Sequence, residues 1–479
     1  MRGKSNYINK ALLNVKHDIS DDFWPDILSY SDYLDMNFPA GYFKNYTPDQ
    51  IIPLNIPKPT LILRPGHFIK FTDRIYFQMI INEFAGIVDK KLYNKNIVFS
   101  HRLSSSGGNF FENQIDAWKR FNKKTDNFFN ENEYGFLLKS DISAYFEHII
   151  IKKLISVLLN LGVKKTSCDK LSALLNTWGE FGIPQGYDAS SFLGNVYLHE
   201  VDDEMIRSGF NYYRFADDIR VFAKDEDEAR AAIEKITELF RPLNLHLSGG
   251  KTSILDKEKY FAKKNEYSDE MDAINYSVYR NRSKLNLSLP KLKKIWQDGI
   301  KRRDKTLINF CINRFKNIKS DHPLNIIIKK KLIDPSFTPV IMSYLQDYIS
   351  RRKVQEMLLN LFNSTPYIYQ KIFILKTFLN AKKIFFDVYQ IKKEDVCKTN
   401  NFLLIGYYLV FIGKFGTSGQ KNTIKNDYEQ RYSQDDKISR YFLIALKYFN
   451  NSHQHISFLL RTKISLKYTA NYLKSKKAL

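Results

Sequence analysis

Two adjacent carboxylates, Asp217 and Asp218, interrupt an apolar run in the segment YRFADDIRV, residues 213–221. The flanking residues are aromatic and β-branched, a pattern typical of two strands joined by a tight hairpin. Two carboxylates on one rigid turn repel each other and are tolerated best beside a divalent cation, and Mg²⁺ prefers oxygen ligands. The alternative is an ordinary polar turn, because Asp is common in turns.

A third carboxylate, Asp141, favours the metal site over the ordinary polar turn. The segment FLLKSDISAYFEHI, residues 136–149, is a strand-like hydrophobic run that ends at Asp141 and continues into residues with helical spacing. Phosphoryl transfer by two metal ions requires a small cluster of carboxylates from separate elements. We therefore expect Asp141, Asp217 and Asp218 to bind two Mg²⁺ ions, with Mn²⁺ as an alternative.

The elements that must position these residues follow a readable order. Residues 182–202 contain a rigid turn with Gln185 and Gly186, followed by a helical pattern. After the hairpin, apolar residues between Ala229 and Phe240 recur at the spacing of an amphipathic helix. The segment LHLSGGKTSIL then places Lys251 just after a Gly-Gly turn. The predicted order is strand, helix, helix, hairpin, helix, strand.

Four motifs in this order resemble those of reverse transcriptases. DISAYF is similar to motif A of that family, GIPQGYDASSFLGNVYL to motif B, FADD to motif C and LHLSGGKT to motif D. Upstream, LRPGHFIKFTDRI and FSHRL resemble fingers segments of group II intron and retron-like enzymes. Two departures occur there: the usual Gly-Ile-Pro is replaced by Gly66-His67-Phe68, and Gln78 lies one place later than expected.

The resemblance implies a role for each matching residue. Asp141 and Asp217 would be the metal ligands, with Asp218 assisting. Lys251 would donate a proton to the departing pyrophosphate. The expected nucleotide-binding residues are Arg64, Lys70 and Arg74 at the phosphates, together with Gln185, Gly186 and Phe146.

Phe146 lies five residues after Asp141, where reverse transcriptases carry an aromatic side chain that would collide with a ribose 2′-hydroxyl. The resemblance therefore implies that the enzyme selects deoxynucleotides. The alternative is that Phe146 is a core aromatic of the palm helix, a role that the neighbouring Tyr145 could fill instead.

Composition and charge agree with a nucleic-acid partner. The chain has 479 residues, a formal net charge of +23 and a sequence pI near 9.5, and such a charge favours polyanions. Its three cysteines lack metal-ligand spacing, so neither a zinc site nor a disulfide framework is expected. The N-terminus has no apolar signal core, and the apolar run at residues 402–412 is too short to span a bilayer. We expect a cytoplasmic protein without a membrane segment.

The last part of the chain has a different pattern. From about residue 286, apolar positions recur at helical spacing, as in 340–362, 367–386, 402–412 and 441–449, mostly with Lys-rich opposite faces. A polar stretch at 413–437 predicts a loop or insertion. The expected fold class is α+β. Its predicted domains are an N-terminal region with fingers at 1–135, a ferredoxin-like palm at 136–285, and an all-α domain at 286–479 that resembles HEAT-type repeats.

This layout resembles the bacterial defence-associated reverse transcriptases, including those of abortive infection. The resemblance implies dNTP addition in antiphage defence, templated by a partner RNA or untemplated, with RNA and DNA as partners and assembly into a homo-oligomer. The alternatives are a retron or group II intron-type reverse transcriptase, an RNA polymerase with a palm, and a catalytically idle nucleic-acid-binding scaffold. Phe146 and the Pro-Gln-Gly match disfavour the RNA polymerase.

Overall fold

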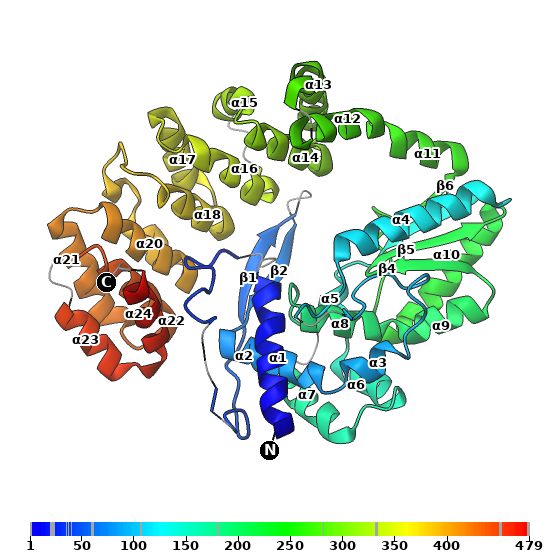
Figure 1. Ribbon diagram of the computed structural model, residues 1–479, viewed down its shortest axis with the longest axis horizontal. Coiled ribbons are helices and arrows are strands. Elements are labelled where there is room, and N and C mark those ends of the chain that lie inside the picture. Colours follow the sequence, from blue (N-terminus) through cyan, green and yellow to red (C-terminus); the bar gives the residue numbers. More distant parts are fainter. Residues whose placement is uncertain are drawn as a thin grey trace. The chain divides into compact units, whose positions relative to one another are not determined.

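The computed structural model describes residues 2–19, 24–34, 36, 38–39, 41–58, 62–105, 108–179, 182–280, 282–330, 334–449 and 453–476 (Figure 1). The chain forms two compact units, each described here by itself. The first, the sheet unit, comprises residues 1–23, 37–54 and 65–266, and the second, the helical unit, comprises 24–36, 55–64 and 267–479.

The centre of the sheet unit is a four-stranded antiparallel sheet with the order β4-β5-β3-β6. Its strands are β3 (Phe136–Asp141), β4 (Asn211–Phe215), β5 (Asp218–Ala223) and β6 (Ser253–Asp256). The predicted hairpin at Asp217 is therefore confirmed, as is the strand that ends at Asp141. A separate two-stranded sheet pairs β1 (Ile52–Pro57) with β2 (Leu63–Phe68).

One face of the four-stranded sheet is covered by α8 (Asp188–Tyr197) and α10 (Glu226–Phe240). Leu138, Ile219 and Val221 are fully buried in this core. The predicted amphipathic stripe is confirmed in α10, which buries residues from Ala229 to Phe240. Acidic residues fill the first turn of α10, where their negative charge stabilises the helix by interacting with the positive end of its dipole.

The opposite face is covered by α4 (Gln114–Glu131) and α11 (Lys257–Asn265). Here Leu137 and Phe222 pack against Phe129 of α4 and Tyr260 of α11. Arg220 of β5 reaches into α4, since its guanidinium donates to Thr125 Oγ1 at 2.6 Å and to Asn122 Oδ1 at 2.8 Å. This face also carries the strand ends at which the carboxylates lie.

Further helices of the sheet unit surround this core. Asn82 of α2 donates to Asn14 Oδ1 of α1 at 3.0 Å, and Asn14 donates to the carbonyl of Gly108 at 2.9 Å, so the first helix is tied to the fingers region. These helices are α1 (Arg2–Asp18), α2 (Phe71–Asn82), α3 (Ala85–Asp89), α5 (Tyr145–His148), α6 (Ile151–Asn160), α7 (Lys165–Trp178) and α9 (His199–Arg207).

The helical unit is built around α20, in which every residue from Phe402 to Gly413 is buried. Gly406 is required there, because a Cβ at this position would lie 2.4 Å from the Tyr441 ring of α22. No described helix has both the length and the apolar character needed to cross a membrane. The α-helices of this unit are α12 (Ser268–Tyr279), α13 (Leu285–Arg302), α14 (Lys305–Asn317), α15 (His322–Lys330), α16 (Thr338–Leu345), α17 (Arg352–Ser364), α18 (Ile368–Phe378), α19 (Lys393–Cys397), α20 (Phe402–Phe415), α21 (Ser418–Asp427), α22 (Asp436–Leu446), α23 (His453–Thr462) and α24 (Lys467–Ser475).

The expected loop at 413–437 is wrong, because α21 and a π-helical turn at Tyr428–Tyr432 occupy most of it. The start of α21 is fixed by a capping box, in which Thr417 and Gln420 satisfy each other's backbone N–H groups. The helical spacing at 340–362 is confirmed as two helices, α16 and α17, with a tighter turn at Gln346–Tyr348 between them. The expected domain start at residue 286 falls inside α13, whereas the compact units divide after Glu266.

An N-terminal segment, residues 24–36, belongs to the helical unit. Its Asp26 and Asp32 are buried and bind the guanidinium of Arg440 in α22, with four N–O distances between 2.6 and 3.0 Å. Thr469 of α24 donates to Asp32 Oδ2 at 2.6 Å. We call this group the Arg440 clamp; it joins residues more than four hundred positions apart.

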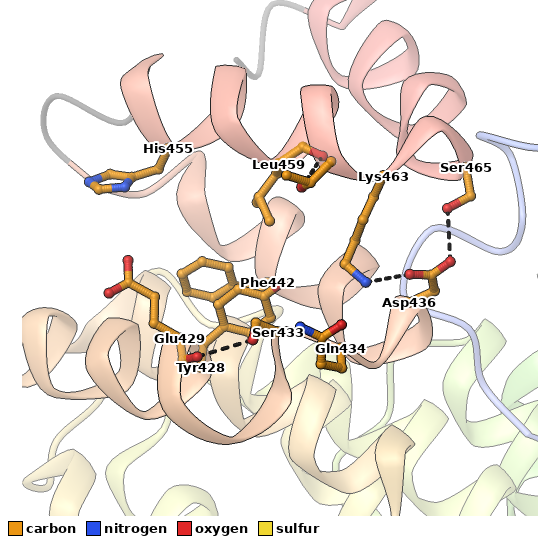
Figure 2. Close-up of a pocket in the computed structure, with 11 residues that line it drawn as sticks. Tyr428, Glu429, Ser433, Gln434, Asp436, Phe442, His455, Leu459, Lys463 and Ser465 are labelled. Atoms are coloured by element: carbon orange, nitrogen blue, oxygen red, sulfur yellow. Dashed lines mark hydrogen bonds and ion pairs between the residues drawn. The ribbon is translucent and has the colours of Figure 1, made fainter.

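The helical unit also contains a cavity of about 980 Å³ between the π-helical turn at Tyr428–Tyr432, α22 and α23 (Figure 2). At one end the rings of Tyr428 and Phe442 stack at 3.9 Å, and at the other Asp436 binds Lys463 and accepts from Ser465 at 3.2 Å. Asp436, the acidic residue of this end, is therefore already bound by Lys463 and Ser465.

Candidate active site

The hairpin tip consists of Ala216 and Asp217, with Phe215 and Asp218 paired across it. Ala216 has a φ of 54°, which is rare for a residue other than glycine. Its strained backbone is held on both sides: its N–H donates to Ser100 Oγ at 2.7 Å, and its carbonyl accepts from Arg214 at 3.1 Å. The tip that presents Asp217 is therefore a fixed structure.

Arg214 organises the support beneath this tip. Its side chain is fully buried and donates to both carboxylate oxygens of Asp202, at 2.7 and 2.5 Å, and to Asn195 Oδ1 at 2.9 Å. Asn195 in turn donates to the carbonyl of Ser100 at 3.0 Å. This network connects helix α8 to the hairpin.

We expect Ser100→Ala to lower kcat for nucleotide addition by about tenfold without unfolding the protein. The substitution leaves the Ala216 N–H without its acceptor, and a buried unsatisfied donor costs about 1–3 kcal/mol. Steady-state kinetics and a thermal melt would measure both effects. Ser190→Ala is the matched control, since Ser190 is equally buried and its Oγ has no hydrogen-bond partner among the described residues. Equal kinetics for the two variants would contradict the role of Ser100.

Asp141 and Asp217 lie close enough to influence each other. Burial, followed by repulsion from Asp141, raises the pKa of the Asp217 carboxyl to about 6. Lys251 places its ammonium group 2.6 Å from Asp141 Oδ2. A cation beside this carboxylate pair relieves the repulsion, so the donor set fits a divalent metal ion, whose charge would do the same.

Asp218 has a different environment from its two neighbours. It lies opposite Asp141 across β3 and β5, so the two side chains share a face of the sheet. Arg220 and Lys139 approach its carboxylate at 3.5 and 3.9 Å. Burial raises the pKa of Asp218, and these two cations oppose the shift. In the part of the chain that the structure describes, no group of three or more His, Cys, Asp or Glu side chains is arranged to hold a metal.

The loop that carries Lys251 is fixed to the strand that carries Asp141. The Ser248 N–H donates to the Asp141 carbonyl at 2.7 Å, and the Ser140 and Thr252 hydroxyls lie 2.7 Å apart. These bonds hold the Gly-Gly-Lys turn beside the carboxylates although the Lys251 side chain is 65% exposed. The backbone at Lys251 is therefore fixed by these bonds, whereas its side chain is exposed.

A cavity of about 670 Å³ opens on this face of the sheet, next to Asp141 and Asp218. Its walls combine cationic and aromatic side chains, which suits the phosphates and bases of a nucleic acid strand. The cationic and aromatic residues that line it are Lys139, Arg220, Lys251, Lys264, Trp118 and Tyr260.

Phe146 is partly buried, and Tyr145 is the core aromatic of this helix. Tyr145 is 6% exposed and donates to the carbonyl of Gly194 in α8. A Cβ at Gly194 would lie 3.1 Å from Phe146 Cε1, so the Phe146 ring rests directly on this glycine. The contact orients the Phe146 ring while leaving part of it accessible.

The turn with Gln185 and Gly186 leads into Tyr187, which connects it to the fingers region. Gly186 has a φ of 97°, a conformation that favours glycine. The Tyr187 hydroxyl donates to the carbonyl of His67 at 2.6 Å and accepts from the Ile69 N–H at 3.2 Å. Gln185 and Gly186 are themselves partly exposed.

The three expected phosphate-binding cations have different surroundings. Lys70 is exposed and pairs with Asp49 at 3.1 Å. Arg74 is 3% exposed, binds Asp18 of α1 at 3.0 Å, and lies over the Tyr187 ring at 4.7 Å. Arg64 is partly buried and belongs to the helical unit. Lys70 and Arg74 thus each have an acidic partner within the sheet unit.

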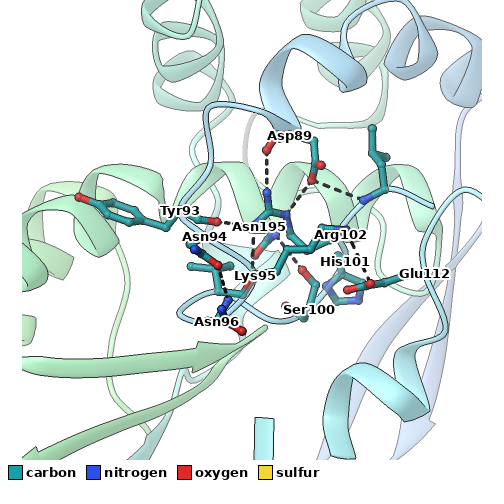
Figure 3. Close-up of polar contacts among 12 residues, drawn as sticks. Asp89, Tyr93, Asn94, Lys95, Asn96, Ser100, His101, Arg102, Glu112 and Asn195 are labelled. Atoms are coloured by element: carbon teal, nitrogen blue, oxygen red, sulfur yellow. Dashed lines mark hydrogen bonds and ion pairs between the residues drawn. The ribbon is translucent and has the colours of Figure 1, made fainter. Parts of the chain in front are cut away.

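Sequence reasoning placed Asn195 in motif B and Arg102 in a fingers segment, but it missed the support that Ser100, Asp202 and Arg214 give to the site. Figure 3 shows Ser100 and Asn195 beside Arg102, whose guanidinium binds Asp89 Oδ1 at 2.7 Å and the Asp89 carbonyl at 2.7 Å. The fingers motif indicated Arg102, but its pairing with Asp89 joins α3 to a loop and leaves no local signal. Asp202 and Arg214 were hidden for the same reason, since they are far from their partners in sequence.

Comparison with known proteins identifies the class. Residues 56–272 match the family described as reverse transcriptase (RNA-dependent DNA polymerase). The matched segment includes every residue of the hairpin, of β3 and of the Lys251 turn. This region is a reverse transcriptase domain, and the protein is an RNA-directed DNA polymerase, a nucleotidyltransferase. Domains of this family use divalent metal ions and act on nucleic acid, in agreement with the carboxylate pair.

The other comparisons are distant. Among solved structures, telomerase from Candida albicans in complex with a TWJ fragment of telomeric RNA is similar over 72% of this chain and 68% of that chain, with 10% identity and a TM-score of 0.32. That similarity is too low to support an inference. No curated protein matches the chain.

Proposed function

We propose that the protein adds dNTPs to a growing DNA strand by two-metal nucleotidyl transfer. The supporting observation is the pair of carboxylates at the end of β3 and the tip of the β4–β5 hairpin, with the Lys251 ammonium 2.6 Å from one of them. Asp141 and Asp217 would hold two Mg²⁺ ions, or Mn²⁺ as the alternative, with Asp218 assisting from the adjacent position. When bound, the ions would neutralise charge at the attacking and leaving oxygens.

The chain's own residues would orient the nucleotide and move a proton. Lys251 would donate a proton from Nζ to the departing pyrophosphate, a role supported by its fixed turn and exposed side chain. Gln185 and Gly186 would contact the nucleotide. Lys70 and Arg64 would bind its phosphates. Arg74 would join them only after its guanidinium leaves Asp18, because an ion pair occupies its donors.

Phe146 would exclude ribonucleotides, and its replacement tests the polymerase itself. With an RNA template, a DNA primer and competing dNTPs and rNTPs, we expect the wild type to extend with dNTPs. We expect Phe146→Ala to raise rNTP use relative to dNTP use by about tenfold or more, since removing a steric block of this kind changes discrimination by about 1–3 kcal/mol. Sizing the products and hydrolysing them with alkali would measure the ratio.

Two controls sharpen this test. Phe146→Tyr keeps a ring on Gly194 and should keep the wild-type ratio, whereas Tyr145→Phe removes only the bond to the Gly194 carbonyl and should leave sugar choice unchanged. An unchanged ratio in Phe146→Ala would place the sugar filter elsewhere. If the wild type, supplied also with a homopolymer and with no template, incorporated no dNTPs in Mg²⁺ or Mn²⁺, the idle scaffold would be the better reading.

We further propose that this polymerase serves in cytoplasmic antiphage defence, with a partner RNA or no template, as a homo-oligomer. The support is architectural: a compact reverse transcriptase domain is followed by a unit of helices, a layout that resembles defence-associated enzymes and their HEAT-type domains. Cells that express the wild type should restrict phage plaques, and cells with an inactive Asp217→Asn enzyme should not. Equal protection by both would remove DNA synthesis from the defence role.

A further inference from the structure

Two tyrosines on one face of α12 are exposed to solvent. Tyr276 and Tyr279 lie three positions apart, so their rings share one side of the helix, and they are 50% and 55% exposed. The opposite side of α12 supplies its packing, with Ile274, Ser277 and Val278 buried. The two rings are therefore not needed to attach α12 to the helical unit.

Cationic side chains flank both rings. The Lys284 ammonium lies 5.6 Å from the centre of the Tyr276 ring, and the Arg314 guanidinium, which also donates to Asn275 Oδ1 at 2.7 and 3.1 Å, lies 5.8 Å from that of Tyr279. Asn317 of α14 donates to the Tyr279 hydroxyl at 2.7 Å, which fixes the orientation of this ring. We call Tyr276, Tyr279, Lys284 and Arg314 the tyrosine surface.

The charge around the tyrosine surface is strongly positive. Residues 280–305 contain ten Lys and Arg residues against two carboxylates. Both carboxylates are engaged within the fold: Asp298 accepts from Tyr267 at 2.9 Å, and Asp304 caps the first turn of α14. On α12 itself, Asp272 lies one turn and Asp269 two turns before Tyr276, both are exposed, and they limit the positive region on that side. The charge favours a polyanion that extends from the tyrosines toward α13.

We propose that the tyrosine surface binds single-stranded nucleic acid by stacking unpaired bases on Tyr276 and Tyr279 while the nearby cations hold the phosphates. Exposed aromatic rings within a cationic track are the usual means of binding a single strand, because every base has a face that stacks. An acidic protein would satisfy the charge but gives no reason for two exposed rings. This inference deepens the proposed function and rests on it, since a polymerase needs a strand to copy or extend.

The test measures binding of labelled oligonucleotides to the full chain by fluorescence anisotropy, without dNTPs or divalent metal. The probes are oligo(U), oligo(dT) and a DNA duplex of the same length. We expect Tyr276→Ala with Tyr279→Ala to weaken single-strand binding by about tenfold or more, a loss typical of removing stacking rings. Tyr276→Phe with Tyr279→Phe keeps the rings and should bind as the wild type does. Tighter binding of one single-stranded probe would identify the strand as RNA or as DNA.

Matched controls keep the result interpretable. Tyr389→Ala changes another tyrosine of the helical unit, which is 48% exposed, and should not change affinity. Lys284→Gln should reduce the salt dependence of log Kd by about one unit, as expected when one phosphate contact is lost. A thermal melt would show that each variant is folded. If the double Ala variant bound as well as the wild type, or lost duplex and single-strand binding equally, stacking at this surface would be wrong.

Failure of this inference is distinguishable from failure of the proposed function. The binding assay contains neither dNTPs nor divalent metal, so its result is scored separately from dNTP incorporation. Tyrosine-dependent binding without dNTP incorporation would support the surface and oppose the polymerase proposal. Incorporation of dNTPs together with binding that does not depend on the two tyrosines would support the polymerase proposal and oppose the tyrosine surface.

Discussion

Asp217→Asn is expected to reduce dNTP incorporation by about a thousandfold or more while the protein remains folded. The substitution keeps the shape of the side chain but removes the charge from a proposed metal ligand, and loss of such a ligand removes several kcal/mol of transition-state stabilisation. Primer extension in Mg²⁺ and in Mn²⁺ would measure the effect. In metal-free buffer at pH 7 the variant should melt no lower than the wild type. Burial and Asp141 raise the pKa of Asp217 to about 6, so its ionised form opposes folding above that pH.

The matched control is Asp218→Asn. The Asp218 carboxylate has Arg220 and Lys139 at 3.5 and 3.9 Å, and these cations already offset part of its charge, so we expect a smaller loss of activity than for Asp217→Asn. Equal loss in the two variants would make Asp218 an equal partner in metal binding. A folded Asp217→Asn enzyme with near wild-type rate would show that the assignment of Asp217 is wrong.

Arg440→Met should produce the largest loss of stability. The side chain is buried and binds two buried carboxylates, Asp26 and Asp32, which would be left without a counter-charge. Breaking a buried ion pair in this way typically costs about 3–5 kcal/mol. Urea unfolding followed by circular dichroism would measure the loss, and limited proteolysis should show earlier cleavage within residues 24–36.

Two further variants identify the cause. Arg461→Met removes an exposed arginine from the same unit and should change stability little. Combining Arg440→Met with Asp26→Asn and Asp32→Asn removes all three charges and should recover part of the loss, because the penalty arises from unpaired buried carboxylates. If Arg440→Met unfolded at the same urea concentration as the wild type, the Arg440 clamp would contribute nothing to stability.

The sheet and the carboxylate positions were readable from sequence because their signals are local. Each element is specified within a few residues by its own pattern of apolar side chains. These patterns are the apolar residues on both sides of Asp217, the apolar run that ends at Asp141, and the apolar stripe of α10. The turn before Lys251 is marked by two consecutive glycines. The family resemblance then supplied the order in which the elements combine.

The remaining features depend on contacts between distant residues, which no local pattern announces. Asp18 and Arg74 are 56 positions apart, so a cation that reads as a phosphate ligand lies in a buried ion pair. Lys371 and Lys376, which read as surface charges beside apolar residues, are half-buried, and Lys371 lies 5.3 Å from the Phe362 ring. Helix α21 was missed because its residues are polar, although Thr417 and Gln420 carry a capping signal.

The Arg440 clamp also has a consequence for the order of events on the ribosome. Residues 24–36 emerge early, but their partners Arg440 and Thr469 are among the last residues to be synthesised. The helical unit cannot be completed until the nascent chain is nearly finished, and until then Asp26 and Asp32 need water or a chaperone around them. A fragment that begins at residue 267 would lack Asp26 and Asp32, and a fragment that ends before α22 would lack Arg440. Truncation at either end would therefore remove part of the Arg440 clamp, whereas point substitutions elsewhere in the chain keep the clamp intact.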